Sequence, residues 1–146
     1  MWIVYALLAA LFWGMSYTYS EQVLKKISVP SLLLFEASAN VIMALCIGLA
    51  GKTFVTDWQT IKQGQLDAKV FFICLIVYAI ANLFIMMSIQ AKNATMAGLI
   101  EISYPIFTAF FAWLIFKETQ FNAGTIFGGL LILSGVCCVY IYGKNI

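Results

Sequence analysis

The stretch that decides the fold covers residues 95–116 and reads TMAGLIEISYPIFTAFFAWLIF. An α-helix rises about 1.5 Å per residue, so about 20 apolar residues cross the roughly 30 Å hydrocarbon core of a bilayer. The stretch meets this length and carries a single charged residue, Glu101. It therefore predicts a transmembrane helix with a carboxyl group inside the membrane.

Four other stretches have the same character, and together they predict the fold class. They cover residues 2–20, 30–50, 70–91 and 122–142. The chain is 64% hydrophobic and only 10% charged, which leaves too little polar surface for a soluble domain of 146 residues. The sequence predicts an all-α integral membrane protein, a bundle of five transmembrane helices in a single domain over residues 1–146. The first stretch lacks a basic leading region and is interpreted as a retained span.

Composition also argues against several classes of function. The chain has no histidine, and its four cysteines fall within the apolar stretches, where they behave as small apolar residues. No metal ligands or cofactor are expected, and an intramembrane enzyme is a weak hypothesis. A net charge of +2 is too small to indicate nucleic-acid binding.

One connection between the stretches is long, at residues 51–69. Residues 56–62 could form one or two helical turns at the membrane interface, anchored by Trp58 and Ile61. An ordinary solvated loop is the alternative, and the sequence leaves both open. Before the last stretch, Asn122 is predicted to be a helix N-cap.

Carboxyl groups inside hydrocarbon indicate function, because burying an ionised one costs roughly 2.5 to 3.5 kcal/mol on insertion scales. Glu36 and Glu101 each lie about 9 Å along their helices from the same membrane face. Asn82 comes at a similar depth, and Glu21 belongs at that same surface. The polar groups are therefore predicted to form a layer.

Polar side chains recur at three- and four-residue spacing, which places them on single helix faces. The predicted substrate and proton site consists of Glu101, with Glu36 secondary, and of Asn40, Asn82, Trp13, Tyr17 and Tyr104. The two tyrosines and the tryptophan offer ring faces to a cation. The competing interpretation is structural: the acids join helices by hydrogen bonds, and the aromatic residues only pack.

Pro105 is predicted to be a hinge. It has no N–H to donate to the carbonyl four residues earlier, which is that of Glu101, and a kink is expected there. In the last stretch, Gly124, Gly128 and Gly135 form a surface that permits close helix contact. These glycines are predicted to make a dimer contact, with packing inside the chain as the alternative.

Some of these residues resemble a known family. Residues 11–16 (LFWGMS), 104–118 (YPIFTAFFAWLIFKE) and 124–136 (GTIFGGLLILSGV) resemble EamA-type domains of the drug/metabolite transporter superfamily, and the likeness covers essentially the whole chain. The resemblance implies five spans per domain. Most members carry two such domains as inverted repeats in a ten-span exporter, so this chain corresponds to one half.

The last three stretches also resemble small multidrug resistance proteins, which work as antiparallel homodimers. Those proteins carry an essential glutamate midway along their first span, where this chain has Gly14 and Met15. That role therefore does not transfer to any residue here. Many EamA relatives have a basic residue where Glu36 stands, so their substrate classes do not carry over either.

The sequence and these resemblances together suggest a secondary transporter of the inner cell membrane. It would export small cationic or amphipathic metabolites or drugs, coupled to protons, as an antiparallel homodimer. The alternative is a half-transporter or accessory subunit that needs a different partner chain.

The lysines bear on orientation. Four are expected on the side of the N-terminus (Lys52, Lys62, Lys69 and Lys117) and four on the other (Lys25, Lys26, Lys92 and Lys144). Equal numbers give almost no positive-inside bias, which predicts dual topology. The alternative is a fixed cytoplasmic N-terminus with a heteromeric partner.

Overall fold

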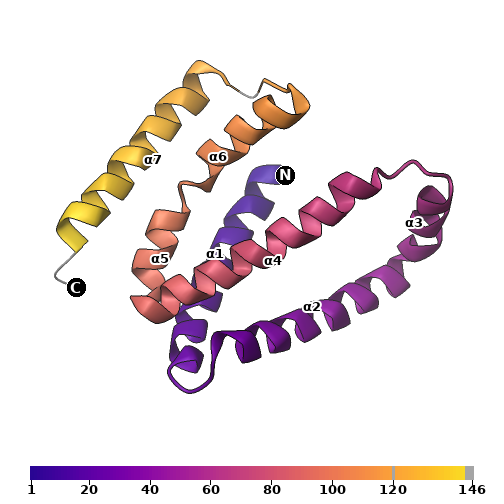
Figure 1. Cartoon of the computed structure of the whole chain (residues 1–146), viewed down its shortest axis with the longest axis horizontal. Coiled ribbons are helices and arrows are strands. Elements are labelled where there is room, and N and C mark those ends of the chain that lie inside the picture. Colours follow the sequence, from indigo (N-terminus) through magenta and orange to yellow (C-terminus); the bar gives the residue numbers. More distant parts are fainter. Residues whose placement is uncertain (120, 144–146) are drawn as a thin grey trace. The chain divides into compact units, whose positions relative to one another are not determined.

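The helices of the computed structural model follow the apolar stretches closely. The structure describes residues 1–119 and 121–143, and this part of the chain is helical and contains no strand. Its elements are α1 (Trp2–Leu24), α2 (Val29–Gly51), α3 (Thr53–Lys62), α4 (Ala68–Ala91), α5 (Ala94–Glu101), α6 (Tyr104–Phe111), the π-helical turn η1 (Ala112–Phe116) and α7 (Ala123–Tyr142) (Figure 1).

The predicted fold class is confirmed. Five helical stretches among the described residues are long and apolar enough to cross a membrane: Trp2–Leu24, Val29–Gly51, Ala68–Ala91, Ala94–Phe116 and Ala123–Tyr142. The first stretch runs to Leu24 rather than to residue 20, because a helix continues for as long as its backbone hydrogen bonds do, past the end of the apolar sequence.

The described chain divides into two compact units. The first contains Met1–Glu21 and continues from Ser88 to the end of the chain, and the second contains Gln22–Met87. The first unit thus holds most of α1 together with α5, α6, η1 and α7. The second holds α2, α3 and most of α4. The prediction of a single domain over residues 1–146 stays a prediction.

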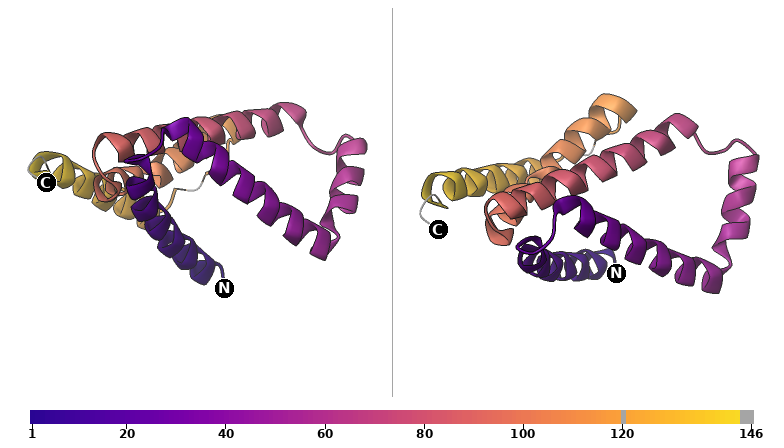
Figure 2. Two further views of the ribbon diagram at one scale, coloured as in Figure 1. Left: turned by 90° about the horizontal axis from the view of Figure 1, so that it is seen from below. Right: turned by 60° about the horizontal axis from the view of Figure 1, so that its bottom comes forward.

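In the second unit, the connection after α2 forms a helix, so the helical interpretation of residues 56–62 is confirmed and the loop interpretation is wrong. This helix, α3, is longer than predicted, and it joins the end of α2 to the start of α4 (Figure 2). The chain turns between α2 and α3 at Lys52, whose φ of 56° lies in the left-handed region. A Cβ at Gly48 would overlap the ring of Phe54, so the glycine lets this ring lie directly against α2.

In the first unit, the fourth apolar stretch is interrupted where Pro105 predicts a kink. Helix α5 ends at Glu101 and α6 begins at Tyr104. Across the break, the Ser103 N–H donates to the Ile100 carbonyl at 3.2 Å, and the Ile106 N–H donates to the Ser103 carbonyl at 3.1 Å. These shorter-range bonds replace the regular α-helical pattern, because a proline cannot donate one.

The last helix begins as predicted. Asn122 Oδ1 accepts the Thr125 N–H at 2.9 Å, and Thr125 Oγ1 accepts the Asn122 N–H at 2.8 Å. This reciprocal pair satisfies two backbone donors that a helix start would otherwise leave unpaired. The predicted N-cap role of Asn122 is confirmed.

Candidate functional site

Glu101 and Tyr17 meet in the first unit. The Tyr17 hydroxyl, on α1, donates a hydrogen bond of 2.6 Å to Glu101 Oε2, on α5. Tyr17 is 9% exposed, and Glu101 is half-buried. Two of the predicted site residues, 84 positions apart in the sequence, therefore touch.

Gly98 lies directly under the ring of Tyr17. A Cβ at Gly98 would lie 3.5 Å from Cδ2 and 3.8 Å from Cε2 of Tyr17, so the tyrosine ring packs directly over the glycine. Ala94 and Ala97 are buried on the same helix. Sequence reasoning missed Gly98. The small residues at 94, 97 and 98, just before an acid in an apolar stretch, were the signal for a close helix contact.

A second bond joins α1 to the start of α5. Glu21 Oε2 accepts the Ala94 N–H at 2.7 Å, and Asn93 Oδ1 accepts the Met96 N–H at 2.8 Å. These acceptors satisfy two of the free N–H groups at the helix N-terminus. The bond brings Glu21 to the start of α5, and the prediction that it lies at the membrane surface stays a prediction. Tyr17 lies one turn before Glu21 on α1, so the two bonds hold α1 against α5 at two levels.

The predicted aromatic residues divide between two places. The rings of Trp13 and Tyr17 lie 5.6 Å apart, centroid to centroid, at an angle of 51°. Trp13 is 46% exposed, so part of its ring remains open beside the Tyr17–Glu101 pair. Tyr104 is 62% exposed and belongs to α6, beyond the break in the helix.

The other predicted polar residues belong to the second unit. Glu36 and Asn82 are half-buried, and Asn40 is exposed. The Asn82 side-chain amide donates to the carbonyl of Tyr78, on its own helix, at 3.0 Å. The joint site predicted for Glu101 and Glu36 stays a prediction.

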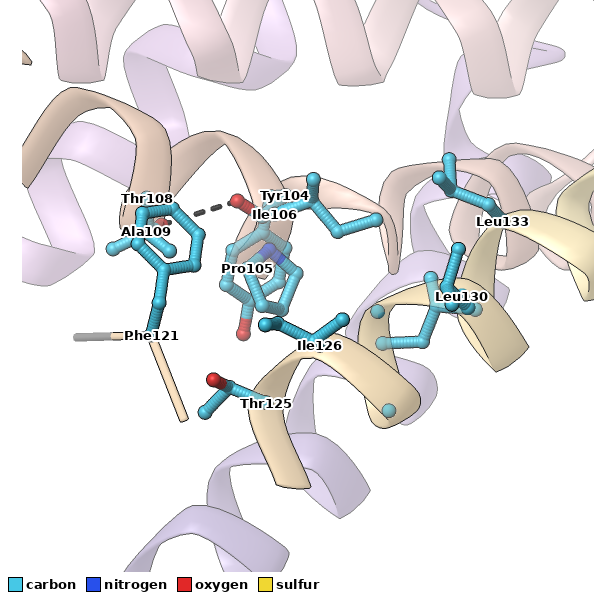
Figure 3. Close-up of a pocket in the computed structure, with 13 residues that line it drawn as sticks. Tyr104, Pro105, Ile106, Thr108, Ala109, Phe121, Thr125, Ile126, Leu130 and Leu133 are labelled. Atoms are coloured by element: carbon cyan, nitrogen blue, oxygen red, sulfur yellow. Dashed lines mark hydrogen bonds between the residues drawn. The ribbon is translucent and has the colours of Figure 1, made fainter. Parts of the chain in front are cut away.

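A pocket lies between α6 and α7, within the first unit (Figure 3). Its volume is about 660 Å³, within the range typical of small-molecule sites. The lining residues are Tyr104, Pro105, Ile106, Thr108, Ala109, Phe121, Thr125, Ile126, Gly128, Gly129, Leu130, Ile132 and Leu133. Figure 3 shows the Thr108 hydroxyl turned back to the Tyr104 carbonyl, to which it donates at 3.1 Å. Apart from this paired hydroxyl, the pocket lining is largely apolar, which suits an alkyl or aryl group.

The glycines of α7 have different surroundings. A Cβ at Gly129 would lie 3.6 Å from Ile106 Cγ1, so this glycine packs against α6. A Cβ at Gly128 or Gly135 would have no described atom of a neighbouring element within 4 Å, and one at Gly124 would lie 3.2 Å from Asn122 Oδ1. The predicted dimer contact of Gly124, Gly128 and Gly135 stays a prediction.

Residues 1–141 match the model of the EamA-like transporter family. No curated protein and no solved structure matches the chain significantly. The match covers nearly all of the sequence and agrees with the five apolar helices. It confirms the resemblance seen in the sequence: the chain belongs to the EamA-like transporter family, whose members are membrane transporters of the drug/metabolite superfamily.

Proposed function

We propose that this multi-pass membrane transporter exports small cationic or amphipathic metabolites or drugs in exchange for protons, with Glu101 as the binding group. The observation that carries the proposal is the Tyr17–Glu101 hydrogen bond inside an apolar span. Acidic residues in such spans are rare, and they mark ion or proton pathways because an unpaired charge there is costly.

The exchange follows from the chemistry of a single carboxylate. An ionised Glu101 attracts a cation, and a protonated one does not. Substrate and proton therefore exclude each other at the same oxygens, so that loading one releases the other. The exposed Trp13 side chain, whose ring contacts that of Tyr17, would offer a quaternary ammonium group a cation–π contact worth about 0.5 to 2 kcal/mol.

The α6–α7 pocket supports the amphipathic part of the proposal. Its first lining residues, Tyr104 and Pro105, follow Glu101 directly across the helix break. We assign the charged group of the substrate to Glu101 and its apolar group to this pocket. Each methylene buried there would contribute about 0.8 kcal/mol.

The assembly that we propose is an antiparallel homodimer of chains inserted in both orientations. The open surface at Gly135 supports it, because membrane helices associate through small residues. Balanced lysines support insertion in both directions, although Lys144 lies outside the described residues. Two opposed copies would rebuild an inverted repeat.

Flux through proteoliposomes tests this function. In liposomes that contain only the purified protein, protons flowing down an imposed gradient should drive a quaternary ammonium compound in the opposite direction. Glu101→Gln should abolish that flux. Glu21→Gln is the matched control, since it also removes one carboxylate of the first unit but keeps an oxygen that accepts the Ala94 N–H. Normal flux in Glu101→Gln would overturn the proposal. Glu101-dependent cation binding without flux would favour the half-transporter that needs a different partner chain.

A further inference from the structure

We propose that Tyr17 is a positioning residue that orients the Glu101 carboxylate, and that Gly98 is the residue that lets it do so. The inference rests on the proposed function of Glu101 and deepens it. It assigns a role to a glycine, Gly98, through its packing against the Tyr17 ring. Two contacts support it: the Tyr17 ring packs over Gly98, and the Tyr17 hydroxyl donates a hydrogen bond to the Glu101 carboxylate.

Glu101 needs an external support because of its place in the chain. It is the last residue of α5, and regular α-helix resumes only at Tyr104. A carboxylate has two oxygens, and the Tyr17 hydroxyl occupies Oε2. The bond fixes the rotation of the group and leaves Oε1 to receive a cation or a proton. The carboxylate is therefore held in one orientation before its ligand arrives, which lowers the entropic cost of binding.

The support depends on a small residue at position 98. A methyl group there would make an ordinary contact with the Tyr17 ring at 3.5 Å. A branched side chain would add atoms where the ring now lies and would force it away from α5. Alanine should therefore be accepted at this position, whereas valine should break the Tyr17–Glu101 bond without changing either of its partners.

The register of α1 is fixed independently. The Glu21 carboxylate holds the first N–H of α5, one turn along α1 from Tyr17. Loss of the Tyr17 hydroxyl alone thus leaves α1 attached to α5. This separation allows the positioning role to be distinguished from a role in holding the two helices together.

The test compares four variants of the purified full chain: Tyr17→Phe, Gly98→Val, Gly98→Ala and the double variant Tyr17→Phe/Gly98→Val. Calorimetry would measure the Kd of benzyltrimethylammonium. Tyr17→Phe and Gly98→Val should each weaken binding by about tenfold, as expected when a hydrogen bond to a charged group is lost. Gly98→Ala should bind like the wild type. The double variant should be no weaker than either single variant, because both remove the same bond.

A spectroscopic readout separates positioning from packing. The infrared carboxylate band that disappears in Glu101→Gln should shift in Tyr17→Phe and in Gly98→Val, and should stay in place in Gly98→Ala. If Gly98→Val does not fold, Tyr17→Phe decides the question through the same band and the same Kd.

The test distinguishes failure of the positioning role of Tyr17 from failure of the proposed function of Glu101. Wild-type or tighter binding by Tyr17→Phe, together with lost binding by Glu101→Gln, would overturn the positioning role and leave the proposed function intact. Wild-type binding by Glu101→Gln would overturn the proposed function itself. Additive losses in the double variant would show that Gly98 acts on something other than the Tyr17–Glu101 bond.

Discussion

At the residue scale, the two carboxylates that contact neighbouring helices in the first unit do different work. Glu21 accepts a backbone N–H at the start of α5, which is a capping role. Glu101 accepts a side-chain hydroxyl within the span and retains a second oxygen. The chemical group is the same, but Glu21 lies at a helix start, whereas Glu101 lies within the span and is the residue that we propose binds the substrate.

Replacing the capping acceptor should therefore affect stability. Glu21→Ala leaves the Ala94 N–H without its carboxylate partner, and Asn93→Ala does the same to the Met96 N–H. Each should lower the stability of the protein by about 1 kcal/mol, the usual cost of losing a helix cap. Thermal unfolding in detergent measures the loss. A Glu21→Ala variant as stable as the wild type would show that this bond does not stabilise α5.

At the element scale, the sequence predicted the membrane spans and the helix break, and it did not predict how α1 meets α5. Length and hydropathy specify spans, and Pro105 specifies an interruption, because both are local properties. The role of Gly98, by contrast, depends on its contact with Tyr17, which lies on another helix. Helical periodicity places residues on faces and does not identify the partner of a face. The local sequence does not predict the π-helical turn at Ala112–Phe116 either. Lys117, which follows that turn, takes a φ of 60° although it is not a glycine.

The α6–α7 pocket gives a prediction at this scale. Ile126 lines the pocket, whereas its neighbour Phe127 is 71% exposed and does not. In the wild type, lengthening the chain of an alkyltrimethylammonium ion should tighten binding by about fourfold per methylene, the equivalent of 0.8 kcal/mol. Ile126→Trp should fill the pocket and remove this gain, while binding of tetramethylammonium stays unchanged.

Phe127→Trp is the matched control for that series, because it adds the same side chain on the outer face of α7. It should retain the dependence on chain length. A gain per methylene that survives in Ile126→Trp would place the apolar group of the substrate elsewhere. Equilibrium binding by calorimetry in one detergent makes the three proteins comparable.

At the scale of the whole molecule, most apolar side chains of the spans are exposed in the single chain, as expected where lipid or a second copy covers them. Gly135→Leu would place bulk on the open face of α7, away from the pocket that Gly128 lines. It should convert a dimer to a monomer in mild detergent and abolish flux, because close helix contact needs small residues. Light scattering after size-exclusion chromatography measures the mass. An unchanged dimer would show that the contact lies on another helix.

The central claim is that substrate and proton compete for Glu101, and proton release on cation binding tests it most directly. A saturating quaternary ammonium ion, added to purified protein in weakly buffered solution with a pH indicator, should release protons from the wild type and from Glu21→Gln. Glu101→Gln should release none. Proton release from Glu101→Gln equal to that of the wild type would contradict the account.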